Sequence, residues 1–152
     1  MSVRRKAREY ALQILFQTEV GGLTPARFEA FWTQWDAPPD ARRFAEDVVR
    51  GVERHADEIN EVLQRHAQHW SLERMATVDR NVLRVAVYEL LHREDVPPRV
   101  VLNEAIDIAK KYGSGESGRF VNGVLDDILK TDPVVSKRLS GTELAHANHL
   151  RR

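Results

Sequence analysis

The sequence predicts an all-α protein of one domain. Apolar residues recur every three or four positions through most of the 152 residues, which is the spacing of amphipathic helices. No segment reads convincingly as a strand, and Gly or Pro residues separate the helical segments. A chain of this length buries a core without disulfide or metal support. It contains no cysteine, which excludes disulfide frameworks, thiol nucleophiles, cysteine zinc sites and a redox role.

Three helical segments are expected in the first half. The first covers about 3–19 and stops before the pair of glycines at 21–22. Thr24 and Pro25 provide an N-cap and a first turn for the second. Its aromatic residues are Phe28, Phe31, Trp32 and Trp35. The third is one long pattern over about 40–69, in which Gly51 marks a kink or a point of close packing.

The second half predicts a short turn from Ser71 and then three more helices. Thr77 caps the most apolar one, about 78–92, whose wide stripe predicts a central position. The others cover about 99–112 and 117–130. We therefore expect a single domain over 1–131, with lobe 1 at about 1–69 and lobe 2 at about 71–131. Residues 132–152 are weakly patterned and are expected to form a docked or disordered tail.

Charge and hydropathy limit the possible partners and location. Lys and Arg total 23, Asp and Glu total 23, and the sequence pI is about 7.0. Strongly basic nucleic-acid domains have a pI above about 9, so any nucleic-acid binding must come from a local patch. Gln13, Gln17 and Glu19 interrupt the apolar stretch behind the basic start, and nothing approaches a membrane span. A soluble, cytoplasmic protein without membrane association is expected.

The clearest local patch lies at the start of the chain. Four cations occupy five positions there, namely Arg4, Arg5, Lys6 and Arg8, and an apolar helical stripe follows them. A helix of this kind docks on a core and offers its basic end to phosphates. The pattern indicates an RNA-contacting terminus, with a solubilising, fraying terminus as the alternative.

A glycine-rich loop at 113–118 matches the pattern G-x-G-x-x-G. It follows a helix instead of a strand, and Arg119 and Phe120 stand where a P-loop has Lys and Ser or Thr, so a nucleotide site is not predicted. Two interpretations stay open: an ordinary connection, or a phosphate contact that uses backbone N–H groups and Arg119. Phe16 and Phe120 are likewise either core residues or stacking partners for an unpaired base.

Metal binding and catalysis have little support in the sequence. The pairs at positions 66 and 69 and at positions 146 and 149 place two histidines on one helical face, but neither has further ligands nearby. Neighbouring acids such as Asp126 and Asp127 point about a hundred degrees apart around a helix, and no nucleophile motif is present. No metal, no cofactor and no enzymatic activity are predicted.

Several segments resemble the NusB family of bacterial transcription antitermination factors. The opening matches in RRKARE at 4–9 and ALQILFQ at 11–17. The second half agrees in order and spacing through VLRVAVYEL at 82–90, DVPP at 95–98, NEAIDIAKKY at 103–112 and FVNGVLD at 120–126. The resemblance covers about 3–129 and implies a non-enzymatic fold of two packed three-helix bundles.

The resemblance also implies partners. A NusB-like protein pairs with NusE, the transcription-factor form of a small-subunit ribosomal protein, and together they bind the single-stranded boxA element of nascent RNA. That complex joins RNA polymerase and suppresses premature termination of rRNA operon transcription. The neutral pI agrees with the need for a helper protein.

Site residues follow from the matching positions. The arginine-rich motif falls on Arg4, Arg5, Lys6 and Arg8, where phosphate contacts are expected. Phe16 and Phe120 match aromatic positions near the family's RNA surface, and Glu116 matches an acidic position in the loop before the last helix. The surface expected to face NusE rests on no matched motif and is placed near the start of the central helix, at Asp79, Arg80 and Arg84.

Other functions stay open at this point. Residues 21–40 match no motif of the family, and the tail from Pro133 extends beyond its usual end. A NusB-like domain also precedes the catalytic domain of some rRNA methyltransferases, so a stand-alone RNA-recognition domain of that kind is one alternative, although no cofactor domain follows Asp126. A protein-binding helical adaptor is another, and homodimers that cover the RNA surface occur in the family.

Overall fold

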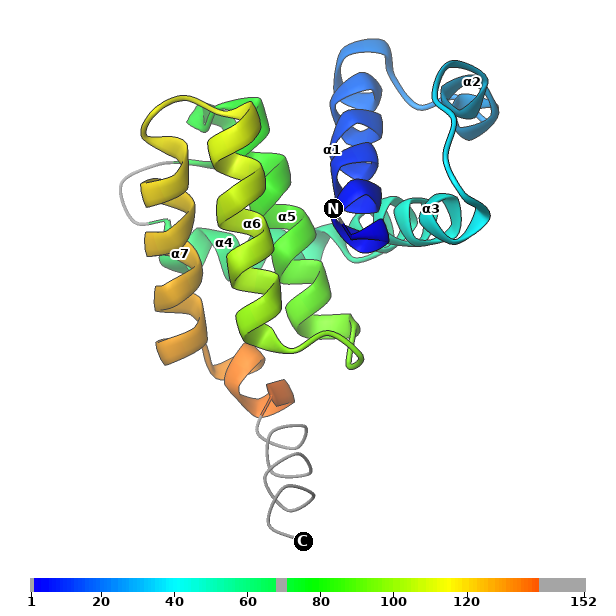
Figure 1. Ribbon diagram of the computed structural model, residues 1–152. Coiled ribbons are helices and arrows are strands. Elements are labelled where there is room, and N and C mark those ends of the chain that lie inside the picture. Colours follow the sequence, from blue (N-terminus) through cyan, green and yellow to red (C-terminus); the bar gives the residue numbers. More distant parts are fainter. Residues whose placement is uncertain (1, 68–70, 140–152) are drawn as a thin grey trace, which may run out of the picture.

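The computed structural model describes residues 2–67 and 71–139, and every regular element in them is helical (Figure 1). The elements are α1 (Val3–Gly21), α2 (Arg27–Gln34), α3 (Pro39–Arg54), α4 (Ala56–His66), the 3₁₀ turn η1 (Leu72–Arg74), α5 (Thr77–His92), α6 (Pro98–Tyr112) and α7 (Ser117–Thr131). Residues 133–139 form a further helical segment. The all-α prediction is confirmed.

Helix α5 is the centre of the molecule, as its wide apolar stripe predicts. It packs against α1, α3, α4, α6 and α7. In Figure 1, α5, α6 and α7 lie side by side, and α1 lies on the other side of α5 with α3 crossing below it. Helix α4 packs against both α5 and α7. Buried apolar residues from all seven α-helices form a single core cluster.

The expectation of one long helix over 40–69 is wrong. The chain breaks at His55, which ends α3 and precedes α4. Charges suit both new helix ends, because Arg54 lies in the last turn of α3 and Asp57 and Glu58 lie in the first turn of α4. The break turns α4 onto α5 and α7. Residues 68 and 69 lie outside the described part of the chain.

Other helix ends differ from the expected ones by a few residues. Helix α1 continues to Gly21, and Gly22 has a φ of 82°, a left-handed conformation that glycine adopts without strain. The N-cap of α2 is Ala26 instead of Thr24, and the N-cap of α5 is Ala76 instead of Thr77.

The beginning of the tail is docked. Asp132 and Val135 are fully buried, and Leu139 is also part of the core cluster. Residues 140–152, with the histidines at 146 and 149, lie outside the described residues. No helix within 2–67 or 71–139 combines the length and apolarity needed to cross a membrane.

Candidate nucleic-acid interface

The basic residues of the N-terminus occupy the first turns of α1. Ser2 is the N-cap, and its hydroxyl oxygen accepts a hydrogen bond from the backbone N–H of Arg5 at 3.0 Å. Cations at a helix N-terminus are repelled by the helix dipole, and α1 has no acid in its first turn to offset this. The fold supplies the missing negative charge from α6 and the loop before it.

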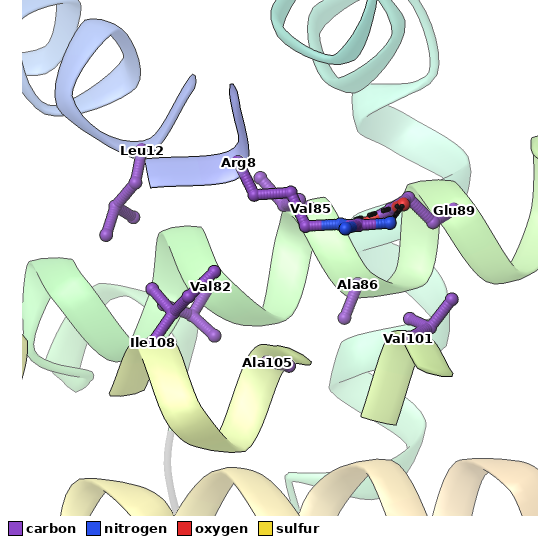
Figure 2. Close-up of a pocket in the computed structure, with 9 residues that line it drawn as sticks. All are labelled: Arg8, Leu12, Val82, Val85, Ala86, Glu89, Val101, Ala105 and Ile108. Atoms are coloured by element: carbon purple, nitrogen blue, oxygen red, sulfur yellow. Dashed lines mark hydrogen bonds and ion pairs between the residues drawn. The ribbon is translucent and has the colours of Figure 1, made fainter. Parts of the chain in front are cut away.

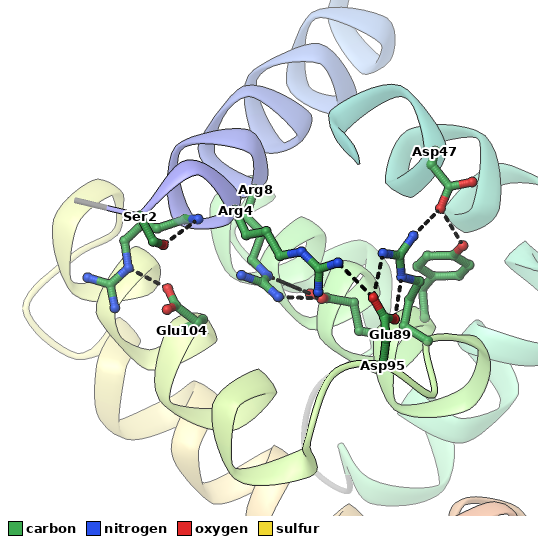
Figure 3. Close-up of polar contacts among 10 residues, drawn as sticks. Ser2, Arg4, Arg8, Asp47, Glu89, Asp95 and Glu104 are labelled. Atoms are coloured by element: carbon green, nitrogen blue, oxygen red, sulfur yellow. Dashed lines mark hydrogen bonds and ion pairs between the residues drawn. The ribbon is translucent and has the colours of Figure 1, made fainter. Parts of the chain in front are cut away.

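Acidic side chains pair with the two outermost arginines (Figure 3). Arg4 Nη2 lies 2.7 Å from Asp95 Oδ2. Arg5 donates to Glu104, and its Nη2 lies 2.8 Å from Asp107 Oδ2. The side chains of Arg4 and Arg5 nevertheless keep 46% and 32% of their surface exposed. The positive charge that the sequence concentrates here is therefore largely offset in the folded chain, while the guanidinium groups stay accessible.

Arg8 lies in the interior, unlike its neighbours. Its Nε and Nη2 donate to the carboxylate of Glu89 at distances of 2.7–3.1 Å, and the two side chains are only 4% and 1% exposed (Figures 2 and 3). The pair lies among apolar residues of α1, α5 and α6. A phosphate contact by Arg8 would require this pair to open.

Lys6 and an aromatic ring complete the cluster. The Lys6 ammonium lies 5.3 Å from the ring centroid of Tyr10. The guanidinium groups of Arg4, Arg8 and Arg93 lie 4.6–5.2 Å from the ring centroid of Phe44. The local sequence around Phe44 does not indicate this contact with three cations, because Arg4, Arg8 and Arg93 are distant from it in the chain.

Asp95 connects this cluster to α5. It accepts hydrogen bonds from Arg4 and from Arg93, and Arg93 also donates to Asp47 at 2.8 Å. Burial opposes ionisation of Asp95, but the hydrogen bonds from the two arginines outweigh it and lower its pKa. The carboxylate is thus held ionised next to the exposed Arg4.

Glu9 forms a second buried contact that sequence reasoning missed. Its Oε1 accepts hydrogen bonds from Lys111 Nζ at 2.6 Å and from the Tyr112 hydroxyl at 2.5 Å. Burial opposes its ionisation, but these two donors prevail and lower the pKa of Glu9. The contact attaches α1 to the end of α6, directly before the glycine-rich loop.

The glycine-rich loop is a tight connection between α6 and α7. A Cβ atom on Gly113 would lie 2.2 Å from Ser117 Oγ, and one on Gly118 would lie 2.7 Å from Lys110 Cγ. Close packing therefore accounts for these two glycines without a ligand. Glu116 and Arg119 are exposed, with 3.9 Å between Glu116 Oε2 and Arg119 Nη1.

The two predicted stacking residues line separate pockets. Phe16 is 46% exposed and borders a pocket of about 310 Å³ together with Trp35 and Tyr112. Phe120 is half-buried and borders a pocket of about 250 Å³ that also includes Asp79 and Glu116. The fold thus brings three of the predicted site residues together at the second pocket.

The residues expected to face the protein partner have different surroundings. Asp79 is 9% exposed, and its Oδ1 has no hydrogen-bond partner among the described residues. Arg80 donates to Glu19 at 2.7 Å and to the carbonyl oxygens of Leu72 and Met75. Arg84 pairs with Glu19 at 3.3 Å, and burial lowers its pKa.

Comparisons with known proteins identify relatives of this arrangement. The model of the NusB family matches residues 5–130. The transcription antitermination protein NusB of Myxococcus xanthus is 44% identical over an alignment of 135 residues, and the match covers 84% of this chain and 95% of that protein. It is named as an antitermination protein and not as an enzyme, in agreement with the predicted non-enzymatic role.

Two solved structures share the fold. NusB of T. maritima is 40% identical, with a TM-score of 0.75 over 84% of this chain and 90% of that one. A crystal structure of the antitermination factors NusB and NusE in complex with dsRNA contains a chain that is 32% identical, with a TM-score of 0.76 over 86% of this chain and 98% of that one.

Proposed function

The chain belongs to the NusB family, and we propose that it acts in transcription antitermination as a non-enzymatic, RNA-binding subunit in the cytoplasm. In this proposal it pairs with the ribosomal protein NusE and binds boxA RNA. The pair then joins the RNA polymerase antitermination complex and suppresses premature termination on rRNA operons. A relative of the same fold is present in a complex with NusE and dsRNA, which supports NusE and RNA as partners.

RNA binding is proposed because Arg4 and Arg5 are exposed at one end of α1. Partly exposed ion pairs contribute only about 0–1 kcal/mol, so a phosphate group competes with Asp95 and Asp107 at little cost. A guanidinium that leaves a carboxylate for a phosphate exchanges one charge-assisted contact for another. The acids hold the arginines in place before RNA arrives and are exchanged on binding.

Arg8 has a different role in this proposal. Its guanidinium is fully engaged in the interior by Glu89, so it positions α1 on α5 and does not itself contact phosphate. Lys6, Arg4 and Arg5 then supply the phosphate contacts of the arginine-rich motif. Phe16 offers an exposed ring to an unpaired base. Glu116, Arg119 and Phe120 form the far edge of the RNA surface at the start of α7.

The surface for NusE is proposed at the start of α5. Asp79 offers a carboxylate oxygen that has no hydrogen-bond partner among residues 2–67 and 71–139, and its side chain borders an open pocket. A buried acceptor without a partner costs about 1–3 kcal/mol, which a donor from the ribosomal protein would recover. Arg80 and Arg84 share Glu19 and hold this end of α5 against α1.

The experiment is RNA binding over a range of salt concentrations, with and without the ribosomal partner. It compares boxA with a scrambled sequence and the native chain with an Arg4→Ala/Arg5→Ala variant. For single-stranded RNA, the slope of log K against log salt falls by about 0.7 for each phosphate contact that is lost. The matched control is Arg43→Ala/Arg50→Ala, which removes the same charge from α3. An unchanged slope in the first variant contradicts the proposal.

A further inference from the structure

Three potential metal ligands meet on a surface away from the glycine-rich loop. They are His55 at the junction of α3 and α4, Glu58 in the first turn of α4, and His92 at the end of α5. One ligand atom from each lies within 4.8 Å of the others. We propose that these side chains form a binding site for a divalent transition-metal ion of the Zn²⁺ class. Sequence spacing gave no signal, because His92 is far from the other two along the chain.

The core holds the three residues together independently of any ion. Gly51 lacks a side chain where a Cβ atom would lie 2.2 Å from the ring of Tyr88, so the end of α3 packs closely on α5. The Tyr88 hydroxyl donates to Asp47 at 3.2 Å, which fixes the ring. The ring of His55 stacks on that of Tyr88 with centroids 6.3 Å apart. The site is thus built on rigid elements, as a metal site requires.

The donor set selects the class of metal. Two imidazole nitrogens and one carboxylate oxygen suit Zn²⁺, which in open sites takes three protein ligands and a water molecule. Ca²⁺ and Mg²⁺ prefer oxygen ligands throughout, so they fit this set poorly. The positive charge of the neighbouring Arg93 does not oppose a cation strongly, because Asp47 and Asp95 both pair with it.

The three side chains lie in a geometry that is related to that of a metal site but differs from it. His92 Nε2 lies 2.7 Å from Glu58 Oε1, and the rings of His55 and His92 stack with centroids 3.8 Å apart and planes 18° apart. Parallel rings do not direct their in-plane lone pairs at one point, so metal binding requires the rings to tilt apart. His92 and Glu58 are 30% and 45% exposed, which leaves them room to move. The ion takes the place of the hydrogen bond between His92 Nε2 and Glu58, and His92 coordinates as the neutral tautomer that carries its proton on Nδ1.

A bound ion would join the α3–α4 junction to the end of α5. Because the unfolded chain does not hold the three ligands together, binding stabilises the folded state and raises the melting temperature.

The test is calorimetric titration of the full chain with ZnCl₂ at pH 7.5, together with absorption spectroscopy of the Co²⁺ form. We expect saturable binding of one ion at this site, and an affinity at least about tenfold lower in His55→Ala and in His92→Ala, since even indirect loss of ligand support costs about 10–100-fold. The ZnCl₂-dependent rise in melting temperature is expected to disappear in both variants.

Control variants separate this site from three of the four other histidines of the chain. His146→Ala/His149→Ala and His69→Ala are expected to keep the affinity of the native chain. Glu58→Gln keeps the size of the side chain but removes its charge, so it is expected to weaken binding without unfolding the protein. The proposal is overturned by the absence of saturable binding, by affinity that persists in His55→Ala and His92→Ala, or by affinity that depends on the control histidines instead.

Discussion

Arg8 and Glu89 form a buried, bidentate ion pair that joins the first helix to the central one. Two consequences follow for the arginine-rich motif. Its outer members, Arg4 and Arg5, make exposed or half-buried pairs that solvent reaches, whereas Arg8 is part of the packing between α1 and α5. A stretch that is uniform in sequence therefore contains two kinds of residue, and only one kind is available to RNA without a change in the core.

The first prediction concerns this pair. Replacing Arg8 with Ala leaves the Glu89 carboxylate buried without a cation, which costs about 3–5 kcal/mol of stability. Urea denaturation of Arg8→Ala should show a correspondingly lower free energy of unfolding. Arg43→Ala, which removes an exposed arginine from α3, should change the free energy of unfolding by less than about 1 kcal/mol.

A double variant separates the structural role of Arg8 from a role in RNA binding. Replacing both partners, as in Arg8→Met/Glu89→Met, removes the two buried charges together and is expected to restore most of the stability. If the double variant is folded and binds boxA RNA with the native salt slope, Arg8 is a positioning residue. A slope that falls by about 0.7 would instead identify Arg8 as a phosphate ligand.

The second prediction concerns the acids that face Arg5. Glu104→Gln/Asp107→Asn removes two negative charges from the proposed RNA surface and releases the guanidinium of Arg5. RNA affinity is expected to rise severalfold at low salt, with a salt slope that is equal or steeper by about 0.7. Filter binding over a salt series measures both quantities.

Removing two negative charges anywhere on the protein would also raise RNA affinity, but by less. Glu29→Gln/Asp40→Asn removes two exposed acids from α2 and α3 and serves as the matched control. It is expected to raise affinity much less, because Arg4 and Arg5 pair with other acids and Asp40 pairs with Arg43. Equal gains in both double variants would contradict a local role for Glu104 and Asp107.

The helices were predictable because each carries its own apolar stripe. Helix α5 is central for the reason visible in its sequence, namely that its apolar residues cover most of its circumference. The break at His55 was not predictable, because the periodic pattern continues on both sides and no Pro or Gly stands at the break. The position of the break is set by the packing of α4 on α5 and α7, which is a tertiary effect.

The candidate site, too, was predictable only where it does not depend on tertiary contacts. Residue type and the family resemblance pointed to Arg4, Arg5 and Phe16, and these side chains are exposed to different degrees at the surface. The acids that offset the arginines lie about a hundred positions away in the chain, so no local pattern could reveal them. The burial of Arg8 depends likewise on a partner in α5 that only the fold brings near.

The third prediction compares two glycines inside helices. Gly51→Ala places a methyl group 2.2 Å from the buried ring of Tyr88, and the overpacking is expected to cost about 1–3 kcal/mol. Gly123→Ala is the matched control, because nothing lies within 4 Å of a Cβ atom there. The control should stabilise α7 by about 0.5–1 kcal/mol through helix propensity. Thermal denaturation should show a lower melting temperature for Gly51→Ala and a higher one for Gly123→Ala. A higher melting temperature for Gly51→Ala would contradict close packing between Gly51 and Tyr88.

The fourth prediction concerns the docked start of the tail. Asp132 is fully buried, and it accepts hydrogen bonds from Arg65, His66 and the backbone N–H groups of Val134 and Val135. Burial opposes its ionisation, but the bonds from Arg65, Val135 and His66 prevail and lower the pKa of Asp132 to about 2. Since the ordinary value is 3.8, ionised Asp132 favours the folded state.

The sign of the pH dependence follows from the lowered pKa. At neutral pH, where Asp132 is ionised in both states, its interactions contribute about 2 kcal/mol to stability. This contribution is lost as the pH falls from about 4 to about 2, because the unfolded state then binds the proton first. Asp132→Asn should therefore be less stable than the native chain at pH 7, and the difference should shrink below pH 4.

Asp126→Asn, which removes an exposed acid from α7, should show a small difference in stability from the native chain at every pH. A difference for Asp132→Asn that does not change with pH would show that the charge of Asp132 does not hold the tail in place.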